Sequence, residues 1–259
     1  MSDLLAVTTS SEKRKRLLLF LAAGPRTWDE IKDTLHVTAT GILPQIKILE
    51  DQKLLCREGR QFYLTETGQL IVRFLGPFDG ALAVLGQQRK FWEDHNIHAL
   101  PEEFLLRIGE LEKIQIIECC VEDSFEPHTE FIASLQQASR IKGISPIVHP
   151  RYPNLFLNLA KENKSISLIL TKSAFEKIKR EYYNMLMEGL GYANASLFIY
   201  PDDIHFAYIV TDYCFSISFF LNNGLFDSKQ DLISTSKSAL RFGEDLFTFY
   251  QNRSERLNA

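Results

Sequence analysis

Apolar residues recur at helical spacing in three short segments near the start of the chain. The first covers Lys13–Ala23 and ends at Gly24-Pro25, which a helix does not continue through. The second begins at Thr27-Trp28-Asp29-Glu30, a Thr-x-x-Glu sequence that matches a helix capping box, and it ends near Leu35. The third covers 38–51. Two short strand-like runs follow at 54–58 and 61–64, so the pattern predicts three helices and then a hairpin.

The third helix carries a narrow apolar stripe formed by Ile42, Ile46 and Leu49. Its other face is small and weakly polar. Pro44 lacks the backbone donor that a helix interior needs, and it disfavours helical geometry in the residue before it. We therefore expect the helix either to begin later, near Gly41, or to be kinked at the proline.

Three helices followed by a hairpin is the order of a winged helix-turn-helix domain, which we assign to residues 1–75. On the exposed face of the third helix, hydroxyl and amide groups could read base edges in the major groove. Arginines in the hairpin are placed to contact phosphate or the minor groove. The expected DNA-binding residues are Thr38, Thr40, Gln45, Lys47, Arg57 and Arg60.

The net charge of −4 is unusual for a DNA-binding protein, but the charge differs between the two parts of the chain. Residues 1–75 contain 11 of the 29 Lys and Arg and 9 of the 33 Asp and Glu, a net of +2. The remainder contains 18 and 24, a net of −6. The slight asymmetry fits a DNA-facing head on an acidic body.

After the hairpin the pattern is helical again. A helix is expected over 66–75, interrupted at Gly76-Pro77, and a second apolar helix should extend from 78 to 94. We assign 76–100 to a helical linker. The apolar residues of this segment, and of the last helix of the chain, favour a homodimer, although the two could also cover each other within one chain.

Residues 101–259 alternate between strand-like and helical patterns. This alternation predicts an α/β domain with a mainly parallel sheet. A hairpin over 205–221 and a long final helix over 232–253 complete the domain. The expected strands are 114–121, 143–148, 166–170 and 196–200, and the expected helices are 127–139, 153–162 and 174–190, the last with a capping box at Ser173 and Glu176.

Ligands of parallel sheets bind beyond the carboxyl ends of the strands. The ends of two successive expected strands would lie side by side if those strands are neighbours. They present the expected ligand-binding residues, which are His149, Arg151, Tyr152, Thr171 and Lys172. Two cations that converge on one crevice favour an anionic guest. We therefore expect a small anionic effector; the plainer alternative is that these are ordinary polar loop residues.

The sequence contains no pattern typical of a metal, cofactor or catalytic site. Cys56, Cys119, Cys120 and Cys214 form no CxxC pair and are expected to be free thiols in a reducing cytoplasm. His95-x-x-His98 has no matching Cys/His pair and is expected in a polar linker. No Gly-x-Ser-x-Gly, P-loop or Gly-x-Gly-x-x-Gly motif occurs. We expect neither a catalytic residue nor a membrane-spanning segment.

Four motifs resemble known regulators. Tyr63-Leu64-Thr65-Glu66-Thr67-Gly68 is similar to the exit from the wing in ArsR- and MarR-type winged-helix proteins. Three further segments resemble archaeal two-domain regulators of the methanogenesis regulatory protein type: Leu43-Pro44-Gln45-Ile46-Lys47, Phe91-Trp92-Glu93-Asp94-His95 and Arg107-Ile108-Gly109-Glu110-Leu111. This resemblance covers nearly the whole chain. It implies that the N-terminal domain binds DNA and that the C-terminal domain senses an effector and oligomerises.

The C-terminal domain also resembles the phospholipase D-like sensor domain of TrmB-type archaeal regulators. A working phospholipase D needs His-x-Lys motifs, and none of the six histidines has a lysine two residues on. That route of catalysis is therefore excluded, and we expect no enzyme.

The sequence thus predicts a cytoplasmic, sequence-specific transcriptional regulator that binds double-stranded DNA as a homodimer. Two alternatives remain open at this point. The chain could be a small-molecule enzyme with a winged-helix adaptor, or a ligand-free interaction module.

Overall fold

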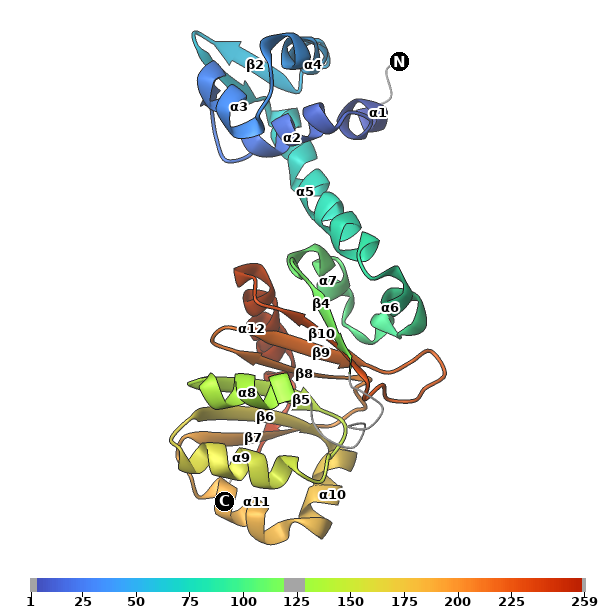
Figure 1. The fold of residues 1–259 in the computed structure, drawn as a ribbon, viewed down its shortest axis with the longest axis vertical. Helices are drawn as coiled ribbons and strands as arrows, with labels where there is room; N and C mark the ends of the chain where they lie inside the picture. Colours follow the sequence, from blue (N-terminus) through green and yellow to red (C-terminus); the bar gives the residue numbers. More distant parts are fainter. Residues whose placement is uncertain (1–3, 119–128, 258–259) are drawn as a thin grey trace. The chain divides into compact units, whose positions relative to one another are not determined.

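The computed structural model describes residues 4–118 and 129–257 (Figure 1). The chain divides into two compact units, Met1–Asp79 and Gly80–Ala259. Cys119 and Cys120, the end of the first expected strand and the start of the helix expected at 127 lie outside the described residues.

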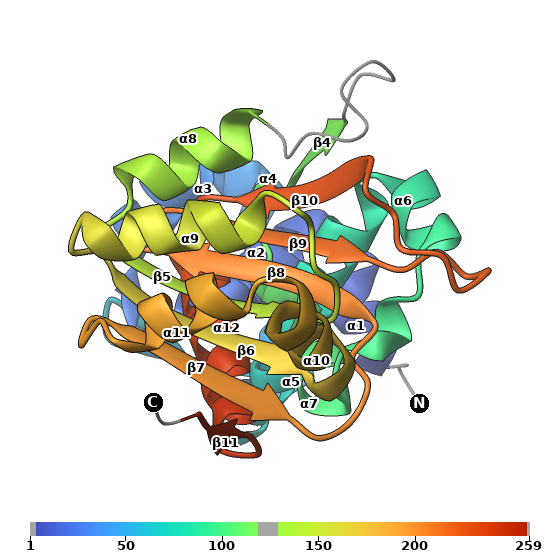
Figure 2. The same cartoon turned by 90° about the horizontal axis from the view of Figure 1, so that it is seen from below.

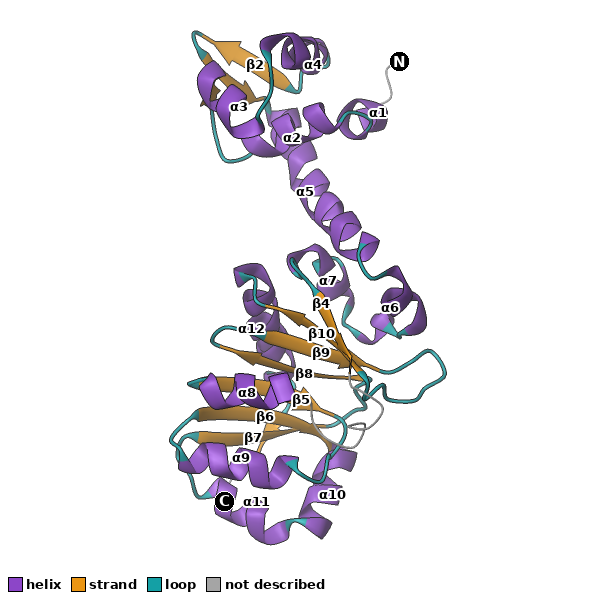
Figure 3. Ribbon diagram, viewed as in Figure 1, coloured by secondary structure: helices purple, strands orange, loops and turns teal. Residues whose placement is uncertain are grey.

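The first unit is built from helices around a three-stranded antiparallel sheet of order β1-β3-β2. The hairpin β2–β3 follows α4, and this is the arrangement of a winged helix (Figure 3). The elements are α1 (Leu4–Thr9), α2 (Glu12–Leu21), β1 (Arg26–Thr27), α3 (Trp28–Leu35), α4 (Ala39–Asp51), β2 (Leu55–Glu58), β3 (Gln61–Leu64) and α5 (Glu66–Gly86), which continues into the second unit.

The core of the first unit forms where the apolar stripes of its helices meet. Leu17, Ile31, Ile42 and Leu49 are fully buried, as the helical spacing predicts. The capping box of α3 is also confirmed: Glu30 Oε2 accepts from the Thr27 backbone N–H at 2.7 Å, and Thr27 Oγ1 accepts from the Glu30 N–H. These two bonds satisfy donors that a helix start would otherwise leave open.

Helix α5 corrects the expectation of a break at Gly76-Pro77. The helix passes through Pro77 and ends at Gly86, before Gln88, whose φ of 52° is left-handed. By length and composition alone α5 is also long and apolar enough to cross a membrane, and we expected no such segment. Its buried residues pack within the folded units: Val72 and Leu75 in the first, Val84 in the second.

The second unit is organised on an eight-stranded mixed sheet of order β11-β7-β6-β5-β8-β9-β10-β4. Its strands are β4 (Gln115–Glu118), β5 (Arg140–Ser145), β6 (Ser165–Thr171), β7 (Ala195–Tyr200), β8 (Phe206–Thr211), β9 (Phe215–Phe219), β10 (Gln230–Ser234) and β11 (Glu255–Arg256). Its helices are α6 (Arg89–Asp94), η1 (Ile97–Ala99), α7 (Glu102–Leu105), η2 (Ile108–Glu110), α8 (Thr129–Gln137), α9 (Tyr152–Lys161), α10 (Lys172–Glu181), α11 (Tyr183–Leu190) and α12 (Lys237–Gln251).

The expectation of a mainly parallel sheet is wrong. Only β5–β6 and β6–β7 pair in parallel, and every other described pair is antiparallel. The reason is that β8 pairs with β5 rather than extending the β7 edge, and the chain then turns back through β9 and β10.

The two faces of this sheet carry different layers (Figure 2). Alternate residues of β8 and β9, among them Phe206, Tyr208, Phe215 and Phe219, form the larger core with α12. Helices α8 and α9 cover the other face. The pleat produces this division because successive side chains of a strand point to opposite faces.

Three expected element boundaries are corrected. Leu232, expected in the final helix, lies in β10, and α12 begins at Lys237. The helix expected over 174–190 is divided at Tyr182 into α10 and α11. The cap of α10 is Thr171, whose side chain accepts from the Ala174 N–H, so the proposed Ser173–Glu176 box does not begin the helix.

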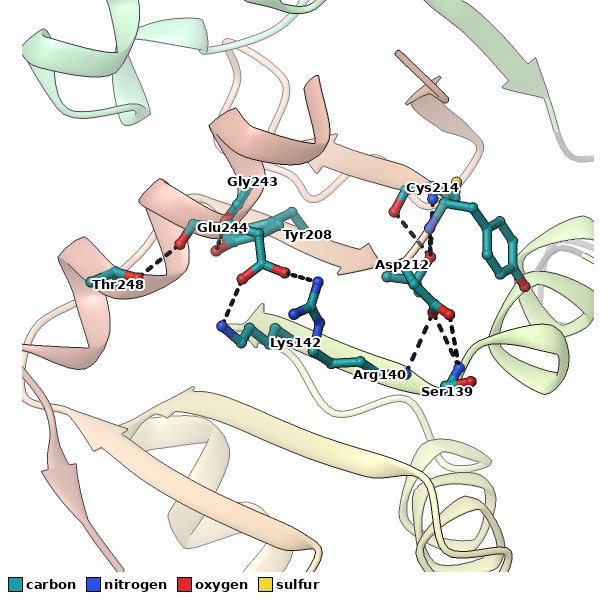
Figure 4. A network of polar contacts seen from close by, with 11 residues as sticks. Ser139, Arg140, Lys142, Tyr208, Asp212, Cys214, Gly243, Glu244 and Thr248 are labelled. Carbon is teal, nitrogen blue, oxygen red and sulfur yellow. Dashed lines mark hydrogen bonds and ion pairs between the residues drawn. The ribbon is translucent and has the colours of Figure 1, made fainter. Parts of the chain in front are cut away.

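A polar network fixes α12 against β5 (Figure 4). The carboxylate of Glu244 lies 2.6 Å from Lys142 Nζ and 3.0 Å from Arg140 Nη2. Nearby, the Tyr208 hydroxyl donates to the Gly243 carbonyl at 3.2 Å. Burial raises the pKa of Tyr208, and the Glu244 carboxylate raises it further. This tyrosine therefore stays neutral and acts as a structural donor.

The segment expected as a linker at 76–100 is largely part of the second unit, which starts at Gly80. Phe91 and Trp92 are buried in its core. His95, expected in a polar linker, is buried as well: Nδ1 lies 2.7 Å from the Phe91 carbonyl and Nε2 lies 3.1 Å from Asp227. Both ring nitrogens therefore have protein partners.

The Arg107–Leu111 motif joins three parts of the second unit. Arg107 pairs with Glu110 at 2.8 Å and with Asp245 of α12 at 2.6 Å. Gly109 lies against the backbone of α5, since a Cβ there would come within 2.6 Å of the Ala81 nitrogen. Only glycine permits so close a backbone approach.

Candidate functional site

The exposed face of α4 is the candidate nucleic-acid interface of the first unit. The helix begins at Ala39, so the later start considered for it is wrong, and Pro44 lies inside it. Thr38, Thr40 and Lys47 are exposed beside this face. Thr38 makes no side-chain cap for the helix, and its hydroxyl lies 3.3 Å from that of Thr40. Both hydroxyls thus stay at the surface, where a base or phosphate could accept from them.

Gln45 is the exception among the expected residues of this face. Its Oε1 accepts from Arg14 Nη1 at 2.8 Å and lies 3.3 Å from Ser11 Oγ. Arg14 also donates through Nε to the Val7 carbonyl at 2.7 Å. The amide oxygen of Gln45 is therefore already used to hold α4 to α1 and α2.

Lys13 is a candidate that the sequence reasoning missed. Its ammonium lies over the first turn of α4, because a Cβ added to Gly41 would be 2.9 Å from Lys13 Nζ. The side chain is exposed. A cation beside a helix start, where backbone donors also face outward, is well placed for a phosphate. The run of four basic residues at 13–16 was the available signal, but the run alone does not show which of them faces α4.

The two arginines of the hairpin differ in their contacts and exposure. Arg57 is held by a hydrogen bond from Nε to the Gly59 carbonyl at 3.1 Å and lies 5.4 Å from the Phe62 ring centroid. Arg60 is exposed at the tip and forms no ion pair within the described residues. Both border a groove that is also lined by Ala39 and Leu43 of α4. The wing and the candidate recognition helix thus share one concave surface, although Asp29 adds a carboxylate to it.

The second unit contains a cavity of about 240 Å³ on the sheet face opposite α12. Its walls are β5, β6, β7 and β8 below and α9, α10 and α11 above. The lining is largely aliphatic, with Leu168, Leu186 and Ile209 among its members. Polar groups are gathered toward β9 and β10, where the Ser218 hydroxyl donates to the Asp231 carboxylate.

The structure brings only part of the expected ligand-binding set to this cavity. His149 and Tyr152 line it, and their rings lie 5.0 Å apart. Arg151 and Lys172 are exposed and are not among the lining residues. Thr171 is buried, and its hydroxyl caps α10. The five residues therefore do not form one crevice.

No cluster of three or more metal-ligating side chains occurs among the described residues. Of the two cysteines described, Cys56 is half-buried in the wing and Cys214 is buried; both are free. Burial raises the pKa of the Cys214 thiol to about 11. The thiol of Cys214 is therefore protonated near neutral pH and is a poor nucleophile.

The geometry defines a winged-helix protein with a second α+β unit that contains a cavity. Family comparison assigns the chain further: residues 2–78 match the N-terminal domain of the methanogenesis regulatory protein FilR1, and residues 124–253 match its middle domain. The chain belongs to the FilR1 family. It is 25% identical over 257 residues to the methanogenesis regulatory protein FilR1 of Methanothrix harundinacea (strain 6Ac). The match covers 97% of this chain but 57% of that relative, so the chain spans little more than half of its length.

Two solved structures are distantly similar. One is TrmBL2, described as an archaeal chromatin protein, with 11% identity, a TM-score of 0.45 and coverage of 99% of this chain and 100% of that one. The other is the phospholipase D family member Nuc from Salmonella typhimurium, with 11% identity, a TM-score of 0.39 and coverage of 57% and 99%.

Proposed function

We propose that this chain is a sequence-specific transcriptional regulator that binds double-stranded DNA through its winged helix. The observation that carries the proposal is the groove shared by α4 and the wing, bordered by exposed Arg60 and by the outer face of α4. The regulatory role of the family, which is printed in the name of the FilR1 relative, supports the same conclusion.

Within the proposed interface the roles divide by chemistry. Lys13, Lys47, Arg57 and Arg60 supply cations for phosphates, which set affinity and orientation. Thr38 and Thr40 supply hydroxyls that hydrogen-bond to base edges. Gln45 supports the helix from behind, although its amide nitrogen still leaves a donor for the interface.

We further propose that the chain acts as a homodimer. A single winged helix contacts few base pairs, and two-fold partners read the two halves of a palindrome. Leu70, Phe74 and Phe78 recur every four residues along the part of α5 that belongs to the first unit, and all are more than half exposed. Such a stripe gives a helix an apolar face suited to a second copy.

The second unit is proposed to sense an effector. Its cavity is formed largely by side chains of regular elements, which makes it a preformed site. An effector could act on DNA binding only by binding two states of the protein with different affinity. We expect its presence to change the affinity of the full chain for its DNA site.

Selection from a random pool of double-stranded DNA with the full chain tests the main proposal. We expect one motif to be enriched, with two inverted half-sites, and its affinity should fall steeply as salt rises. Thr40→Ala should change the preferred base at one position of each half-site. Thr248→Ala, an exposed threonine of α12, is the matched control and should leave the motif unchanged.

Two outcomes would contradict the proposal. A pool without an enriched motif would remove sequence specificity. Binding that does not respond to salt would remove the phosphate contacts. Light scattering decides the dimer separately: a mass near 29.8 kDa, that of one chain, would exclude it, whereas twice that mass is expected.

A further inference from the structure

The floor of the cavity in the second unit is a row of residues across four strands. Leu168 of β6 pairs with Gly143 of β5, Gly143 with Ile209 of β8, and Ile209 with Ser216 of β9. Within this row Leu168 and Ile209 have large side chains, Gly143 has none, and Ser216 has a small one. The space over Gly143 is taken by Ile209, whose Cγ1 would lie 2.8 Å from an added Cβ, whereas the small side chain of Ser216 leaves room at the cavity floor.

The roof is formed in part by one face of α11. Met185, Leu186, Gly189 and Leu190 line the cavity and share this face because they are spaced one, four and five residues apart. A Cβ added at Gly189 would meet no atom within 4 Å. The roof is therefore apolar and has unfilled space at its glycine.

Several polar groups lie at the β9 and β10 end of the cavity, and Ser145, His149 and Ser196 also line it. Ser218 of β9 pairs with Ala207 of β8, and its hydroxyl donates to Asp231 of β10. Ser216 and Ser228 also line this end. The serine hydroxyls can donate or accept hydrogen bonds, and the Asp231 carboxylate can accept them.

We propose that the cavity binds a small, largely aliphatic molecule with an uncharged polar end that donates a hydrogen bond, such as an aliphatic alcohol. The aliphatic part lies under α11 and the hydroxyl points to Ser218 and Asp231. This inference rests on the sensing role proposed above and names the class of effector. The volume of about 240 Å³ is just below the range of roughly 300–1,000 Å³ found for small-molecule sites, so the ligand is small.

The charge of the lining separates this ligand from the anionic effector expected from the sequence. No lysine or arginine is among the described residues that line the cavity; its basic side chain is His149, and Asp231 adds a carboxylate. Placing a second anion beside a carboxylate in an apolar cavity is unfavourable, because both charges are poorly solvated there. An alcohol meets the same groups without this cost.

A fluorescent probe tests occupancy in the full chain. N-phenyl-1-naphthylamine is neutral, largely apolar and carries one N–H donor, and its emission rises in an apolar site. We expect saturable binding to the wild type. Gly189→Leu places a side chain in the open space of the roof and should weaken binding at least tenfold. Gly86→Leu, at a helical glycine outside the cavity whose Cβ also meets no atom within 4 Å, should leave binding unchanged.

Competition then tests the polar end. 1-Decanol should displace the probe at concentrations at least tenfold lower than decanoate, although both have the same chain length. Asp231→Asn keeps an oxygen to accept from Ser218 but removes the charge, so it should narrow the difference between the two competitors. A purely structural role of Asp231 would not change the ratio of the concentrations at which 1-decanol and decanoate displace the probe.

The inference is overturned if Gly189→Leu, folded by circular dichroism, binds the probe as the wild type does. It is also overturned if decanoate competes as well as 1-decanol. Neither measurement involves DNA, and the DNA selection above involves no ligand. If the probe and competition tests fail while the DNA selection succeeds, the proposed ligand class is rejected and the proposed regulator is retained. If the DNA selection fails while the cavity tests succeed, the proposed regulator is rejected and the ligand site is retained.

Discussion

Arg14 Nη1 donates to Gln45 Oε1 across 2.8 Å, and through this bond the candidate recognition helix is fixed to α2. The same guanidinium reaches α1 through the Val7 carbonyl, and it also donates to the Ser10 hydroxyl just after that helix. One arginine thus ties three helices together. Because of this pairing, Gln45, whose amide could otherwise read a base, helps to hold α4 in place.

The first prediction follows from this pairing. Gln45→Ala leaves a half-buried guanidinium without one acceptor, so the first unit should lose about 1.5–3 kcal/mol of stability, the usual contribution of a hydrogen bond to a charged group. The preferred DNA sequence should change less than with Thr40→Ala. Urea unfolding and site selection on both variants measure the two effects. A changed motif with unchanged stability would return Gln45 to the base-reading residues.

Lys13 gives the second prediction. Lys13→Ala should weaken binding to all sequences alike and make the slope of log affinity against log salt shallower by about 0.9, the change expected for one lost phosphate contact. Titrations between low and moderate salt measure it. Lys229→Ala removes an exposed cation from the second unit and serves as the control, with no expected change in slope. Equal slopes for both variants would exclude Lys13 from the interface.

Gly68 gives the third prediction, on stability. A Cβ at this position would come within 2.1 Å of the Leu54 carbonyl oxygen, so Gly68→Ala should destabilise the first unit by about 3 kcal/mol or more through overpacking. Gly76→Ala lies in the same helix, where the nearest atom would be Leu19 Cδ2 at 3.8 Å. This control should be neutral or stabilising by up to about 1 kcal/mol, as usual for glycine in a helix. Thermal melts compare the two, and equal shifts would contradict the contact.

The fourth prediction concerns alkaline pH. Burial raises the pKa of Cys214 from its ordinary value near 9 to about 11, so between these values the unfolded thiol loses a proton that the folded thiol keeps. The stabilisation is complete below about pH 9 and is lost as the pH rises through about 11. Cys214→Ala should reduce this loss of stability by about 3 kcal/mol, given about 1.4 kcal/mol per pKa unit.

Unfolding of the second unit can be followed separately, because one of the two tryptophans lies in each unit. In a Trp28→Phe background, Trp92 fluorescence reports the second unit. Cys56→Ala is the control and lies in the first unit. Tyr208 and Tyr250, whose pKa values burial also raises, should leave a residual fall in both variants. An unchanged pH dependence in Cys214→Ala would contradict the prediction.

Helical spacing alone predicted which residues of α4 are buried. Ile42, Ile46 and Leu49 are at most 3% exposed, since one stripe of a helix must face the core whatever that core contains. The same reasoning could not show that Gln45 is occupied, because its partner Arg14 lies 31 residues earlier. A long-range hydrogen bond leaves no trace in local periodicity.

The second unit shows the same limit at the level of the sheet. The strands β5, β6, β7, β8 and β9 were located from their apolar runs, and the hairpin of β8 and β9 was predicted, but the pairing of β8 with β5 was not. Pairing of β8 with β5 is decided by packing across the whole domain, and a strand has the same pattern whether its neighbour is parallel or antiparallel. The expected ligand site assumed that the ends of β5 and β6 lie together, and these strands are indeed parallel neighbours. The sequence pattern could not show that Arg151 and Lys172 lie outside the cavity.

Helix α5 has a practical consequence for dividing the protein. The boundary between the two units falls between Asp79 and Gly80, inside this helix. A fragment cut at that point would end inside the helix, and its last turn would fray. Asp79, which pairs with Lys15 at 2.6 Å, would then carry the new terminal carboxylate. A fragment of the winged helix should therefore extend to Gly86. Expressed in this way it would retain the complete helix that its core residues Val72 and Leu75 require.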